Sequence, residues 1–106
     1  MLPDKFYKSL LLDYYGDFLT THQKDILEDY FFNDLSMNEI GENHSISKSA
    51  VSDLIKRSVK QLEDFENKLG LIQKKVAFDK LIEMMKNDQN DLSKYIDEIE
   101  RINNNV

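Results

Sequence analysis

The stretch "SMNEIGENHSISKSAVSDLIKRSVKQL", residues 36–62, decides the fold. Ser36 is followed three residues later by Glu39, the capping-box spacing that predicts the start of a helix. This short helix is expected to end near Asn43, and "HSI" then forms a turn. Ser47 is placed to cap a second, longer helix. A short helix, a tight turn and a capped second helix predict a helix-turn-helix motif.

The second helix of this motif has two distinct sides. At 100° per residue, the side expected to face inward consists of Val51, Leu54, Ile55, Ser58 and Leu62. The opposite side consists of Ser49, Asp53, Lys56 and Lys60, with Ser52 and Arg57 at its flanks. We expect the inward side to pack against Ile40 of the short helix. The small Gly41 is expected to permit close approach of the two helices.

The outward side of the second helix carries most of its charge. Residues 47–62 hold four cations and one anion, a net charge of +3. Because the whole chain has a net charge of −6, the remaining residues have a net charge of −9. A local positive face on an acidic body is typical of a nucleic-acid footprint. The candidate binding residues are Ser47, Lys48, Ser49, Ser52, Asp53, Lys56, Arg57 and Lys60.

A simpler interpretation of the same face is also open. Lysine-rich helix faces are often merely solvated, and Asp53 can pair with Lys56 or Arg57 one helical turn away. Four phosphate contacts imply a salt dependence of only about −3.6 in log–log slope, which is weak for a monomer. Binding to DNA or RNA would therefore require a dimer or a helper protein.

The rest of the chain predicts an all-α fold. Glycine (3) and proline (1) are scarce, and helical periodicity recurs over residues 4–15, 20–32, 71–86 and 91–102. We expect residues 1–70 to form a helix-turn-helix domain with a three- to four-helix core, winged-helix-like or sigma-region-four-like. Residues 71–106 are expected to be a helical extension that packs on the core or on a homodimer partner, within one compact domain overall.

Several functional classes lack sequence support. The chain has no cysteine, which is consistent with the reducing cytoplasm, and no apolar run approaches the roughly 20 residues of a membrane span. His22 and His44 have no second ligand at metal-binding spacing. No glycine-rich phosphate loop and no serine with a plausible base are present. We therefore predict no enzymatic activity, no metal and no cofactor.

Three segments of the chain carry a family resemblance. "LLDYYGDFLT", "DLSMNEI" and "SAVSDLIKR…LEDFENKLGL" together resemble the small bacterial YlxM family, over about residues 11–71. These helix-turn-helix proteins are similar to the fourth domain of sigma factors, and their genes accompany those of the signal recognition particle. The resemblance implies a regulatory role in that pathway, through the particle's protein or RNA, or through transcription.

The turn of the motif departs from the usual pattern. Helix-turn-helix turns usually hold a leucine and a glycine where this chain has His44 and Ser45. We expect Ser45 to adopt a positive φ, at a cost in stability for a non-glycine residue, and His44 to weaken the local core. Ser52 is also small, at a position where the family often has an aromatic residue.

Three hypotheses about function follow. The leading one is a binding module of the signal recognition particle system, because the family resemblance implies that pathway and the acidic body is unsuited to binding DNA alone. The alternative is a DNA-binding transcription regulator that uses the helix beginning at Ser47. The third is a structural adaptor whose helix-turn-helix has lost its binding role.

Overall fold

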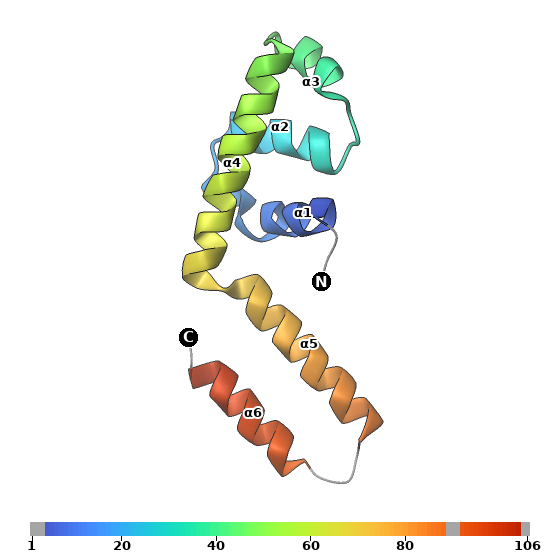
Figure 1. Ribbon diagram of the computed structural model, residues 1–106, viewed down its shortest axis with the longest axis vertical. Helices are drawn as coiled ribbons and strands as arrows, with labels where there is room; N and C mark the ends of the chain where they lie inside the picture. The colour runs from blue at the N-terminus through green and yellow to red at the C-terminus, as the bar shows by residue number, and fades with distance from the viewer. Residues whose placement is uncertain (1–3, 89–91, 105–106) are drawn as a thin grey trace. The chain divides into compact units, whose positions relative to one another are not determined.

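The computed structural model is all-α, as predicted (Figure 1), and describes residues 4–88 and 92–104. Its elements are α1 (Asp4–Tyr15), the 3-10 turn η1 (Gly16–Phe18), α2 (Thr21–Phe31), α3 (Met37–His44), α4 (Lys48–Leu69), α5 (Leu71–Asn87) and α6 (Ser93–Asn104). Within the described residues there is no β-strand, and hence no β-wing. None of the described helices is long and apolar enough to span a membrane.

The chain divides into two compact units, Met1–Lys68 and Leu69–Val106, and each is described by itself. In the first unit, α1, α2 and α3 lie one after another along α4, which is the longest helix (Figure 1). The second unit is a hairpin in which α5 and α6 lie side by side and run in opposite directions (Figure 1). Whether the extension packs on the core or on a dimer partner stays a prediction.

Two capping boxes begin helices of the first unit, because Thr20 and Gln23 have the same spacing in the sequence as Ser36 and Glu39. The Gln23 backbone N–H donates to the Thr20 hydroxyl at 3.2 Å, and the Thr20 N–H donates to the Gln23 side chain at 3.0 Å. Ser36 and Glu39 make the same pair of bonds, at 3.1 and 3.0 Å. Each box satisfies N–H groups that a helix start would otherwise leave unpaired.

The core of the first unit lies between α4 and the three shorter helices. Its buried apolar residues are Leu11, Leu12, Tyr15, Ile26, Leu27, Ile40, Val51, Ile55, Val59 and Leu62. Helical spacing in the sequence predicts an apolar stripe of Phe6, Leu10, Leu11 and Tyr14 on α1. This prediction is partly wrong, because Phe6 is 51% exposed and Tyr14 36% exposed. Tyr15 is buried instead, since its ring stacks on Phe65 and its hydroxyl donates to Glu66 at 2.5 Å. Leu69, which helical spacing also predicts to face inward at the end of α4, is exposed.

One buried polar contact joins α2 to α4. The Ser58 side chain is fully buried, and the Gln23 side-chain amide donates to its hydroxyl oxygen at 3.1 Å. The same amide nitrogen donates to the Gln61 side chain at 2.7 Å. Gln23 therefore completes the capping box of α2 and also satisfies a polar group inside the core.

The hairpin has a small core of its own. Leu81 of α5 packs with Tyr95 and Ile102 of α6, and the partly buried residues around them are Ala77, Phe78, Met85 and Ile99. The predicted start of the last helix at residue 91 falls outside the described residues, and the helix continues two residues beyond the predicted end, to Asn104. Other apolar residues that the sequence places on these helices are exposed: Val76, Ile82, Leu92 and Ile96.

Candidate functional site

The turn of the helix-turn-helix is tighter than the sequence suggested. Helix α3 ends at His44, one residue beyond the predicted Asn43, so only residues 45–47 connect α3 to α4. Ser45 has φ 58° and ψ 41°, which confirms the predicted left-handed conformation. Its N–H donates to the Glu42 carbonyl at 3.4 Å, and the Ile46 N–H donates to the Gly41 carbonyl at 2.9 Å. These bonds close the C-terminus of α3.

Gly41 is the residue that permits this turn. A Cβ added at Gly41 would lie 2.7 Å from the Ile46 carbonyl oxygen and 3.6 Å from the Lys48 amide nitrogen. The obstacle is backbone, which cannot rotate away as a side chain can. The close approach predicted for Gly41 is thus observed, with the turn and the start of α4 as its neighbours.

His44 has a partner that sequence spacing did not reveal. Its Nε2 lies 3.0 Å from the Asp29 carboxylate of α2, and its ring meets that of His22 edge to face, with centroids 5.9 Å apart. The hydrogen bond from His44 holds the pKa of Asp29 below its usual value. The expectation that His44 weakens the core thus missed a polar link between α2 and α3. No group of three side chains suited to a metal ion occurs within residues 4–88 and 92–104.

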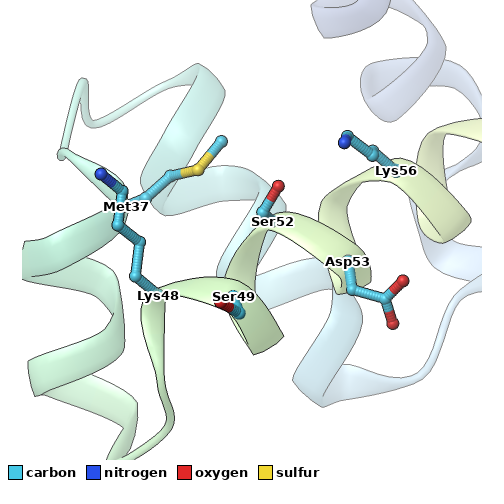
Figure 2. A pocket seen from close by; sticks show the side chains of 6 residues that line it. All are labelled: Met37, Lys48, Ser49, Ser52, Asp53 and Lys56. Carbon is cyan, nitrogen blue, oxygen red and sulfur yellow. The ribbon is translucent and has the colours of Figure 1, made fainter.

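The outward face at the start of α4 borders a pocket of about 390 Å³. Figure 2 shows its lining, which consists of Met37, Lys48, Ser49, Ser52, Asp53 and Lys56. Lys48 extends alongside Met37 of α3, whereas Asp53 projects in another direction (Figure 2). Five of the eight candidate residues from the sequence are therefore gathered around one cavity. The pocket has an apolar wall from Met37 and cations at both ends of its α4 side.

The other three candidate residues lie outside the pocket lining. The Ser47 hydroxyl accepts from the Ala50 N–H at 3.0 Å, so its role is to cap α4. Arg57 pairs with Asp53 at 2.9 Å, as helical spacing allowed, and Lys60 pairs with Asp64 at 3.3 Å. In the part of the chain that the structure describes, Lys48 and Lys56 make no ion pair.

Met37 is the pocket residue that was not a sequence candidate. The sequence places it on α3 only as an apolar residue directly after the Ser36 cap. Its position next to Ser36 gave no signal that it would reach α4, because the route of the turn sets that distance. A half-buried methionine beside lysines suits a surface that adapts to a partner.

Comparison with known proteins supports the helix-turn-helix assignment. Residues 2–102 match the model of the UPF0122 family, described as "Putative helix-turn-helix protein, YlxM / p13 like". Among related UPF0122 proteins, one from Malacoplasma penetrans is 53% identical over 60% of this chain and 60% of its own length. One from Caldanaerobacter subterraneus is 43% identical over 81% of this chain and 74% of its own. One from Clostridium perfringens is 39% identical over 92% of this chain and 93% of its own length. This chain belongs to the UPF0122 family of YlxM- and p13-like helix-turn-helix proteins.

Proposed function

We propose that this protein is a cytoplasmic, non-enzymatic binding protein of the signal recognition particle pathway. Its partner would be the particle's protein or RNA, contacted through the pocket at the start of α4. The family resemblance supports the choice of pathway, and the pocket at the start of α4 supports the choice of contact surface. A regulatory effect on the particle would result from this binding alone.

The observation that carries the proposal is the small number of available cations on α4. Of the four cations between residues 47 and 62, Arg57 and Lys60 are engaged by Asp53 and Asp64. Lys48 and Lys56 stay available, with two serines and Met37 between and beside them. With two phosphate contacts, the logarithm of the binding constant falls with the logarithm of the salt concentration with a slope of only about −1.8. Such a face is suited to a mixed polar and apolar partner surface more than to a long stretch of phosphates.

Recovery of the particle by the tagged full-length chain tests the proposal. We expect the particle's GTPase or its RNA to be enriched from a bacterial lysate. Replacing both Lys48 and Lys56 with alanine should lower that recovery about tenfold, because each lysine offers one charged contact of about 0.7 kcal/mol. Lys60→Ala is the matched control, since Lys60 lies on the same helix but outside the pocket. Enrichment of neither component would contradict the proposal.

A DNA-binding transcription regulator is the second candidate. The observation in its favour is the capped start of α4, with Lys48 and Ser49 exposed where a recognition helix meets DNA. It predicts that duplex DNA binds at low salt and that Lys56→Glu with Arg57→Glu abolishes this binding. The slope of affinity against salt, measured by fluorescence anisotropy, should be near −1.8 for two contacts and −3.6 for four. Absence of binding at low salt would exclude this role.

A further inference from the structure

The α5–α6 hairpin leaves aliphatic side chains half exposed beside its core. Ile82 is 49% exposed, Leu92 52% and Ile96 51%, while their neighbours Phe78 and Ile99 are only partly buried. These residues differ from scattered surface aliphatics because they border the contact between two helices. Such a set is large for a hairpin this short.

The helical positions of these residues put them on one face of the hairpin. Ile82 directly follows the core residue Leu81, and Ile96 directly follows the core residue Tyr95. Each step of one residue turns the helix by 100°. Viewed along their common axis, one helix of an antiparallel pair turns clockwise and the other turns anticlockwise. If the two core residues face each other, the residue that follows each of them therefore lies on the same side of the helix pair. Leu92 lies one turn before Ile96 and extends this face.

We propose that this face, formed by Phe78, Ile82, Leu92, Ile96 and Ile99, binds the same face of a second copy of this chain. In a two-fold dimer both copies use the same surface, so each of these residues becomes buried in both subunits. Two such hairpins packed face to face form a four-helix bundle, in which antiparallel helix pairs bury their apolar sides.

The charge of the extension favours a second copy over a charged partner. Residues 69–106 contain six lysines and arginines and seven acidic residues, a net charge of −1, whereas residues 1–68 carry −5. The extension therefore has little net repulsion toward its own copy. It also offers no excess of cations to attract RNA and no large excess of anions to attract a basic protein.

Analytical ultracentrifugation of the full-length chain tests this inference. We expect a dimer at micromolar concentration, and the dissociation constant should rise at least a hundredfold in Ile82→Glu and in Ile96→Glu. Val76→Glu is the matched control, because Val76 is 51% exposed on α5 but points away from both the core and this face. The control should keep the dissociation constant of the parent chain within about threefold.

Circular dichroism on the same samples separates loss of the interface from loss of the fold. Retained helicity in monomeric Ile82→Glu and Ile96→Glu supports the inference. A parent chain that is monomeric up to high concentration would overturn it. A dimer that resists both substitutions, or one that Val76→Glu dissociates equally well, would also overturn it.

Discussion

The two units of this chain differ in how completely they bury their apolar residues. In the first unit, residues from four helices close a core in which Leu11, Ile26 and Leu62 are fully buried. In the second, the core consists of Leu81, Tyr95 and Ile102, and several aliphatic residues outside it are about half exposed. Four helices surround an interior, whereas two helices can only share a seam. The first unit thus buries most of its aliphatic side chains among its own helices, and the second leaves several of them exposed.

Removing a core residue of the hairpin should give the largest effect. Leu81→Ala deletes buried methyl groups from a core that has few others, so the free energy of opening should fall by about 3 kcal/mol. Native-state hydrogen exchange should show faster exchange in α5 and α6 but unchanged protection in α4 between residues 51 and 62. Val76→Ala, at an exposed position on α5, should change exchange little. Equal loss of protection in both units would show that they unfold as one.

Gly41→Ala tests the first unit at its tightest point. The added Cβ would lie 2.7 Å from the Ile46 carbonyl oxygen, so the turn must move, and the free energy of unfolding should fall by about 2 kcal/mol. Urea denaturation measures this loss. Gly16→Ala is the control, because its closest neighbour, at 3.1 Å, is a side-chain methyl of Leu12 and not backbone. If Gly41→Ala leaves the free energy of unfolding unchanged, the turn is less constrained than its geometry indicates.

Gln23→Ala should be nearly as costly as a change in the turn. It removes one half of the capping box and leaves the buried Ser58 hydroxyl without its Gln23 partner, a combined loss of about 1.5 kcal/mol. Thermal unfolding followed at 222 nm would detect it. Gln61→Ala removes only an exposed bond and should cost less than about 0.5 kcal/mol. Equal effects of the two substitutions would argue against a special role for Gln23.

Ser45→Gly should stabilise the first unit. The left-handed conformation costs a non-glycine residue about 1–2 kcal/mol, and the greater freedom of unfolded glycine offsets part of that gain. We expect a net stabilisation of about 0.5–1 kcal/mol in urea denaturation. Ser47→Gly, at the α4 cap, should not stabilise the protein. A destabilised Ser45→Gly would refute this account of the turn.

Replacing Asp29 should give an effect of similar size to Ser45→Gly, but one that depends on pH. Because its pKa is lowered in the folded state, the carboxylate adds stability above its unfolded-state pKa of about 3.9. This stability is lost as the pH falls through the lower folded-state pKa. The advantage of the parent chain over Asp29→Asn, about 1 kcal/mol at pH 5–6, should therefore shrink below about pH 4. Asp13→Asn, at an exposed position on α1, is the control for removing one negative charge.

Local signals predicted much of the first unit because they depend on neighbours in sequence. Thr20, Ser36 and Ser47 each cap the helix that follows them, and Ser45 has the positive φ expected from its place in the turn. The predictions that were wrong concern side chains whose burial depends on contacts with residues far away in the sequence. Tyr15 packs on Phe65 and donates its hydroxyl hydrogen to Glu66, and 51 positions of sequence separate Tyr15 from Glu66.

The candidate site shows the same division between local and distant information. The outward side of α4 followed from helical spacing, which also allowed the pairing of Asp53 with Arg57. Met37 and the Asp29–His44 hydrogen bond required the path of the turn and the packing of α2 against α3. The spacing of residues along a single helix could predict neither the position of Met37 nor this hydrogen bond.

The double role of Gln23 has a consequence for the cooperativity of folding. Its side chain closes the start of α2 and also fills the hydrogen-bonding needs of a hydroxyl inside the core. Fraying of that helix end therefore exposes an unpaired group in a different helix, which raises the free energy of partial opening. We therefore expect the first turn of α2 to open less readily than a helix end that has no hydrogen bond to a neighbouring helix.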